Sequence, residues 1–132
     1  MVDTTARPFL MFEGGAEAAM NAYVALFADG EILSIERYDA NGPGAEGSVR
    51  LAAFKVAGQQ FMCIDSPAKH AFGFTPAFSI FVDCAEEAEL ERLAAGLGEA
   101  GEFLMPLGDY GFSRRFTWLN DRFGVSWQLN LP

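Results

Sequence analysis

Residues 8–32 read PFLMFEGGAEAAMNAYVALFADGEI, and this stretch decides the fold. An apolar run at 7–12 predicts a short buried strand, which the glycine pair at 14–15 ends. Apolar side chains then recur at spacings of three and four from residue 16 to 27, which predicts an amphipathic helix. Asp29-Gly30 indicates the end of this helix, and residues 31–38 predict a second strand.

The rest of the first half continues with strands. Residues 39–47 are rich in glycine and predict a loop. Residues 48–56 and 59–65 predict a hairpin whose tight turn is Ala57-Gly58. The first half therefore predicts the order strand, helix, strand, strand, strand.

The second half repeats this order after a loop at 66–76. Residues 77–82 predict a strand and 86–97 a helix, with Asp83 as its N-cap and Glu86 completing a capping box. Residues 102–106 predict a short edge strand. The segments 113–120 and 125–131 predict a final hairpin.

Each predicted unit leaves one face of its sheet without a helix. Two such faces curved toward each other would enclose a shared cavity, and concave surfaces are where ligands usually bind. The expected fold class is therefore α+β: two βαβββ modules forming a cupped mixed sheet around a central cavity, with helices on the outer face. The chain is expected to be one domain, 1–132, with module one at about 6–65 and module two at about 77–131.

The composition excludes several classes of partner. The net charge of −9 disfavours nucleic acid and anionic membrane surfaces. No apolar run reaches the length of roughly 18 residues that a membrane span needs, and no signal peptide is visible. The two cysteines, Cys63 and Cys84, lie in apolar runs, which favours reduced, buried thiols and a cytoplasmic protein.

The runs at 8–32 and 121–128 (DRFGVSWQ) resemble PhnB-like proteins of the glyoxalase / bleomycin resistance / dioxygenase, or vicinal oxygen chelate, superfamily. In that superfamily, side chains from the first and last strand of each module hold a divalent metal. The resemblance places these positions near Pro8, at Cys63 or Asp65, near Ala77, and at Gln128. Proline and alanine offer no side-chain donor, so at most two ligands remain, whereas a catalytic site normally has about three. The resemblance therefore implies no tightly bound metal.

Some members of this branch are named demethylubiquinone methyltransferase-like, which implies S-adenosylmethionine. The sequence has no glycine-rich strand-to-helix turn of the dinucleotide type, so no cofactor is expected. The only histidine, His70, lies in a loop outside the four expected metal positions.

Strand alternation selects the candidate binding residues. Gln128 shares a face with Ser126 and Asn130, whereas Trp127 points toward the helix. Phe78, Ile80 and Val82 are likewise expected under the helix, and Phe12, Phe54 and Phe81 are expected to line the cavity. Asp65 is either a ligand contact or a cap for the turn that follows it. The candidate ligand-binding residues are Gln128, Ser79, Asp65, Cys63, Phe81 and Arg114.

Three functions are compatible with these features. The first is a small-molecule binding protein that lacks the usual metal ligands, binds an organic compound and forms a homodimer through exposed strand edges. The second is a metal-dependent lyase, isomerase or dioxygenase with a non-standard site. The third, methyl transfer, rests on a family name alone.

Overall fold

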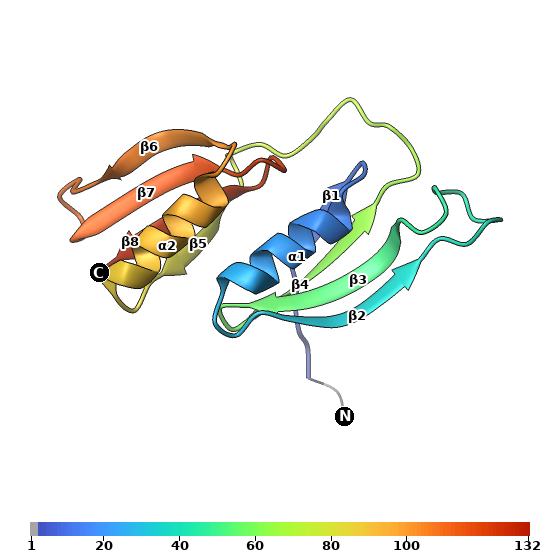
Figure 1. Cartoon of the computed structure of the whole chain (residues 1–132), viewed down its shortest axis with the longest axis horizontal. Helices are drawn as coiled ribbons and strands as arrows, with labels where there is room; N and C mark the ends of the chain where they lie inside the picture. Colours follow the sequence, from blue (N-terminus) through green and yellow to red (C-terminus); the bar gives the residue numbers. More distant parts are fainter. Residues whose placement is uncertain (1–2) are drawn as a thin grey trace. The chain divides into compact units, whose positions relative to one another are not determined.

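A computed structural model describes residues 3–132 and divides the chain into two compact units, Met1–Ala71 and Phe72–Pro132 (Figure 1). Each unit contains one helix and a four-stranded sheet, in the order strand, helix, strand, strand, strand. The α+β class and the two βαβββ modules are therefore confirmed. A single domain with a shared cavity stays a prediction.

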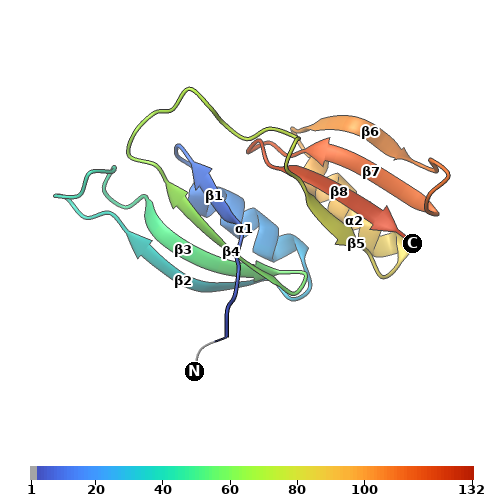
Figure 2. The ribbon, with the colours of Figure 1, turned by 180° about the vertical axis from the view of Figure 1, so that it is seen from behind.

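The first unit forms a mixed sheet in the order β1-β4-β3-β2. Strand β1 runs parallel to β4, and the other neighbours are antiparallel (Figure 2). Helix α1 carries the chain from β1 at one edge of the sheet to β2 at the other edge. Strand β1 can therefore pair with β4, the last strand of the module. The elements are β1 Phe9–Phe12, α1 Ala16–Leu26, β2 Glu31–Arg37, β3 Val49–Val56 and β4 Gln59–Asp65.

The turn between β1 and α1 requires glycine. Gly14 and Gly15 have φ angles of 103° and 87°, in the left-handed region that side chains with a Cβ rarely adopt. This backbone reverses the chain within two residues, so that α1 lies over the sheet that β1 has just joined.

The core of the first unit lies between α1 and its sheet. The ring of Phe54 stacks on Phe61 with centroids 5.2 Å apart, and Tyr23 of α1 lies 6.0 Å from Phe54. Phe12 is also buried and aligns with Asp65 on the same side of the sheet. The prediction that Phe12 and Phe54 line a cavity is therefore wrong, because α1 covers the face on which they lie.

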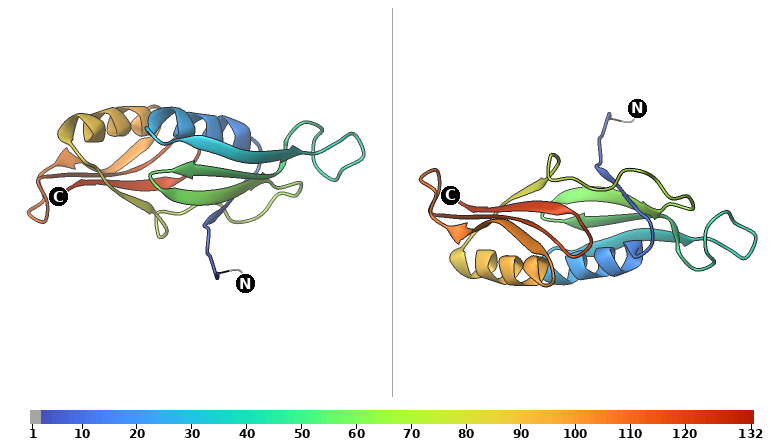
Figure 3. Two further views of the ribbon diagram at one scale, coloured as in Figure 1. Left: turned by 90° about the horizontal axis from the view of Figure 1, so that it is seen from below. Right: turned by 90° about the horizontal axis from the view of Figure 1, so that it is seen from above.

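The second unit repeats the arrangement in the sheet order β5-β8-β7-β6, with β5 parallel to β8. Figure 3 shows each helix on one side of its own sheet. Trp127 of β8 is fully buried on the side of α2, as predicted. The elements are β5 Ile80–Asp83, α2 Glu87–Gly98, β6 Glu102–Gly108, β7 Arg115–Asn120 and β8 Ser126–Leu131.

Two details near the start of this unit differ from the prediction. Asp83 ends β5 instead of capping α2, and the N-cap residue is Glu86, which makes no side-chain cap hydrogen bond. Glu89 instead accepts a hydrogen bond from the backbone amide of Ala85 at 2.9 Å. Phe78 precedes β5 and is 64% exposed, so it does not pack under the helix.

No helix within residues 3–132 has the length and apolar character needed to cross a membrane.

Candidate functional site

Each sheet has one face covered by its helix and one that faces away from it. In the second unit, Trp127 and Leu129 point toward α2, so the alternating residues of β8 point the other way. We call this other side the helix-free face. Strand register places on it Phe81 and Asp83 of β5, Phe116, Trp118 and Asn120 of β7, and Ser126, Gln128 and Asn130 of β8.

Three of the predicted candidates lie together in this unit. The side-chain amide of Gln128 donates a hydrogen bond from Nε2 to Oγ of Ser79, at 2.7 Å. Phe81 aligns with Gln128 in the parallel pairing of β5 with β8, and its side chain is 53% exposed. The structure therefore brings Gln128, Ser79 and Phe81 to one region of the helix-free face.

Asn130, which is not among the six predicted candidates, lies on the same face and has a buried side chain. Its Nδ2 donates to Oδ1 of Asp83 at 2.9 Å, and the residue is only 9% exposed. Its Oδ1 is buried and has no hydrogen-bond partner within residues 3–132, and the same holds for Oδ1 of Asn120. A buried acceptor left unsatisfied costs about 1–3 kcal/mol, so the helix-free face carries two acceptors that a donor from outside the chain would satisfy.

Aromatic side chains lie beside Asn130, whose partner in the β7–β8 register is Phe116. The ring of Phe116 is buried, with the ring centroids of Phe112, Tyr110 and Phe81 at 4.9, 6.1 and 6.3 Å. Phe112 and Tyr110, from the loop between β6 and β7, are 62% and 41% exposed. Exposed aromatic clusters next to polar side chains are typical of binding surfaces.

Asp65 lies in the first unit, on the side of the sheet that α1 covers. Its Oδ1 accepts hydrogen bonds from the amides of Gly14 and Ala16, at 3.1 and 2.9 Å. Its Oδ2 accepts one from the amide of Val49 at 3.0 Å. Asp65 therefore caps the start of α1 and not the turn that follows it, which Ser66 closes through Ala68. Both carboxylate oxygens are committed to the backbone.

Cys63 lies on the same covered side and is fully buried. Burial, and secondarily the charge of Asp65, raises the pKa of the Cys63 thiol to about 12. Burial likewise raises the pKa of Cys84 to about 11, with smaller contributions from the charges of Glu89 and Asp83. Both thiols stay protonated near neutral pH, the form that is neither nucleophilic nor metal-binding.

Arg114 is exposed and sits just before β7. Its Nε donates to the carbonyl oxygen of Pro132 at 2.8 Å, and its backbone amide donates to Leu131. The adjacent Arg115 faces the other way and pairs with Glu87 and Glu91 of α2, each at 2.6 Å. These contacts hold one arginine at the end of β8 and the other against the helix.

His70 lies next to the hydroxyl group of Ser66, a contact that the sequence did not predict. Oγ of Ser66 lies 2.9 Å from Nε2 of His70, and the amide of His70 donates to Glu13 at 3.3 Å. These contacts order the exposed loop after β4.

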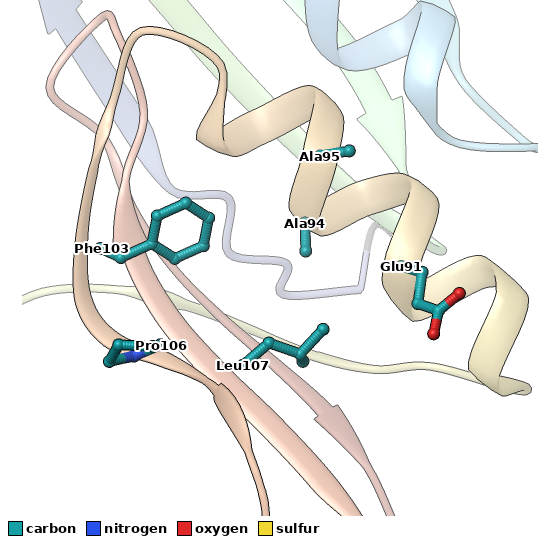
Figure 4. A pocket seen from close by; sticks show the side chains of 6 residues that line it. All are labelled: Glu91, Ala94, Ala95, Phe103, Pro106 and Leu107. Atoms are coloured by element: carbon teal, nitrogen blue, oxygen red, sulfur yellow. The ribbon is translucent and has the colours of Figure 1, made fainter.

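A shallow apolar groove lies between α2 and β6, with a volume of about 380 Å³. Figure 4 shows Ala94 and Ala95 on the helix side and Phe103, Pro106 and Leu107 on the strand side. The one charged group in the lining, Glu91, already pairs with Arg115. With no other charged side chain to orient a ligand, this groove is a weaker candidate than the helix-free face.

At the four positions that the superfamily uses for a metal, few side chains are available as donors. Pro8 and Ala77 have no donor atom, Cys63 and Asp65 point into the covered core, and Gln128 bonds to Ser79. Within either unit of the described chain, no three His, Cys, Asp or Glu side chains converge.

Comparison with known proteins identifies the family. The model of the 3-demethylubiquinone-9 3-methyltransferase family matches residues 4–130. The chain belongs to this family. The PhnB protein from Bacillus cereus, whose description carries the same methyltransferase name, is 55% identical with a TM-score of 0.95. That similarity covers 98% of this chain and 100% of the Bacillus protein.

More distant structures share the fold. A Pseudomonas aeruginosa protein is 29% identical with a TM-score of 0.86, covering 98% of both chains. The fosfomycin resistance protein FosX from Mesorhizobium loti shares the fold, with a TM-score of 0.65 at 14% identity over 100% of this chain and 94% of FosX. The chain is thus a PhnB-like protein with the glyoxalase / bleomycin resistance fold. Comparison with curated proteins finds no match.

Proposed function

We propose that this chain is a small-molecule binding protein whose organic ligand contacts the helix-free face of the second unit. The observation that carries the proposal is the buried, unpartnered Oδ1 of Asn130. A folded protein rarely leaves a buried acceptor unsatisfied unless a water, an ion or a ligand completes it.

The neighbours of Asn130 support a ligand as that partner. Phe81 and Phe112 expose large aromatic surfaces, whose burial against a ligand would be favourable. Polar side chains such as Gln128 and Ser79 stand among them and already hydrogen-bond to each other, so their positions are fixed before a ligand arrives. Aromatic area combined with a few oriented polar groups is the usual composition of a small-molecule site.

We further propose that binding needs no tightly held metal. The side chains at the superfamily positions lack donors, are buried on the covered side, or are hydrogen-bonded within the unit, as described above. A metal would therefore have to recruit ligands from elsewhere.

The family name suggests that methyl groups are transferred from S-adenosylmethionine. The residues present do not fit that cofactor. The turn between β1 and α1, at Gly14-Gly15, is the place where a nucleotide-type group would meet helix amides. Asp65 already accepts hydrogen bonds from two of those backbone amides. No step of methyl transfer is derived for this chain.

We also propose a cytoplasmic homodimer. Strand β2 lies at the edge of its sheet, and its residues Ile32 and Leu33 are 38% and 41% exposed. Apolar residues on an exposed edge favour pairing with another chain.

A fragment screen on the purified protein tests the proposed site. Isotope-labelled protein is screened by NMR, and hits are expected to move the backbone resonances of β5, β7 and β8. Asn130→Ala should weaken these hits, because it removes the acceptor, whereas Asn21→Ala, which removes an exposed amide on α1, should not. Hits that map elsewhere, or that ignore Asn130→Ala, would reject the site.

Elemental analysis of untagged protein, prepared without chelator, tests the metal-free part. About one divalent ion per chain would favour the metal-dependent lyase, isomerase or dioxygenase alternative. We expect no such ion, and no rise in melting temperature with added nickel, zinc, manganese or iron.

A further inference from the structure

We propose that the ligand of the helix-free face is an organic cation that carries an aromatic ring, such as a protonated arylalkylamine. This inference rests on the proposed function and specifies the ligand class of the same site. It follows from which hydrogen-bonding groups, charges and rings the face presents.

The buried side-chain atoms on the face that lack a hydrogen-bond partner are both acceptors. Oδ1 of Asn130 and Oδ1 of Asn120 are buried without partners in the described residues. By contrast, the amide groups of Asn130 and Gln128 and the indole of Trp118 each donate one hydrogen bond to a neighbouring oxygen, at 2.7–2.9 Å. A ligand that satisfies the buried Oδ1 of Asn130 must therefore bring an N–H or O–H donor.

The charge next to Asn130 selects among such donors. Asp83 lies on the exposed side of β5, receives the hydrogen bond from Asn130, and forms no ion pair within residues 3–132. The arginines near β7 are held elsewhere: Arg114 at the end of β8 and Arg115 against α2. Arg122 lies over the ring of Phe123, 4.5 Å from its centroid. The carboxylate of Asp83 is therefore a negative charge without a counter-ion from these groups.

The rings stand at the correct spacing to share a cation with Asp83. Phe81 and Asp83 are two residues apart on one strand and point the same way, so they lie about 7 Å from each other. A cation is attracted to an aromatic face within about 6 Å of its centroid. An ammonium group between Phe81 and Asp83 would contact the carboxylate and a ring at once, while the aromatic ring of the ligand packs on the exposed Phe112. The net charge of −9 adds long-range attraction for cations.

Three probes that share a phenyl ring on a short chain but differ in charge test this inference: 2-phenylethylammonium, 2-phenylethanol and 3-phenylpropanoate. Each is titrated into labelled protein, and dissociation constants come from the resonances of β5 and β8. We expect the ammonium probe to bind about tenfold more tightly than the alcohol, and the carboxylate probe to bind most weakly. Added salt should weaken the ammonium probe alone.

Variants identify the groups responsible. Asp83→Asn keeps an acceptor for Nδ2 of Asn130 but removes the charge, so it should abolish the advantage of the ammonium probe and leave the alcohol unchanged. Glu99→Gln removes one charge at the exposed C-cap of α2 and should change neither. Phe81→Leu should weaken all three probes, and it provides a second test if Asp83→Asn does not fold.

The outcomes distinguish this inference from the proposed function. Binding of all three probes on the face with equal or reversed charge preference would overturn the cation inference and leave the binding site in place. No binding of any probe up to about 10 mM, a concentration at which even weak fragments bind, would reject the proposed site itself.

Discussion

Replacement of Asp65 by asparagine tests whether this carboxylate holds the first unit together. Three backbone amides depend on it: two on Oδ1, from Gly14 and Ala16, and one on Oδ2, from Val49. Asparagine can keep the Oδ1 pair but places an NH₂ group against the amide of Val49, which is fully buried. The variant therefore loses one charge-assisted hydrogen bond and leaves a buried donor unpaired.

The expected loss follows from these contacts. A hydrogen bond to a charged group contributes about 1.5–3 kcal/mol, and an unpaired buried amide costs a similar amount, with overlap between the two. Asp65→Asn should therefore lower the free energy of unfolding by about 2–4 kcal/mol. Asp65→Ala loses all three bonds, and its loss should approach the total stability of a small domain, about 5–15 kcal/mol.

Urea denaturation at neutral pH, followed by circular dichroism, measures both losses. Asp29→Asn is the matched control, because Asp29 also accepts two amide hydrogen bonds, from Ala57 and Gly58, but at an exposed turn. The control should lose about 1 kcal/mol. If Asp65→Asn lowered the free energy of unfolding by no more than this control does, the structural role of Asp65 would be refuted. A ligand contact would then be the remaining explanation for this residue.

Two further predictions concern titratable groups. Because the pKa values of Cys63 and Cys84 are raised to about 12 and about 11, neither thiol should react with a thiol reagent at pH 7–8 in the native protein, and both should react in urea; rapid native labelling of either would contradict their burial. The Gly58 amide, and to a smaller extent that of Ala57, lowers the pKa of Asp29, so its stabilising contribution is present above its unfolded pKa and is lost as pH falls through the folded value. The stability difference between wild type and Asp29→Asn should therefore shrink as pH falls from about 5 to about 2, and a pH-independent difference would mean that the charge plays no part.

Much of the second unit could be predicted because its strands alternate clearly. Trp127 is large and apolar and Gln128 is polar, so a period of two assigns them to opposite faces, and the structure agrees. Phe12 and Phe54 were misassigned because their strands carry apolar residues on both faces. In such a strand, alternation divides the residues between two faces of the sheet but does not tell which face the helix covers.

The acceptors of the candidate site needed the structure. Asn130 meets Asp83 only because β5 lies parallel to β8, and these residues are 47 positions apart in sequence. Asp65 likewise reaches the amides of Gly14 and Ala16 across 51 and 49 positions. Local sequence patterns contain no information about such distant register, so a polar residue at a strand end is equally compatible with a ligand contact, a turn cap and a helix cap.

The two helices begin in different ways, and this has a consequence for hydrogen exchange. The amide of Ala16 is held by a residue of another strand, so it exchanges only when the end of β4 separates from α1. The amide of Ala85 is held by Glu89, four residues away, and is released when this single, half-buried side chain rotates. The first turn of α1 thus opens together with its sheet, whereas the start of α2 frays alone, and the two copies of one supersecondary unit differ in local cooperativity.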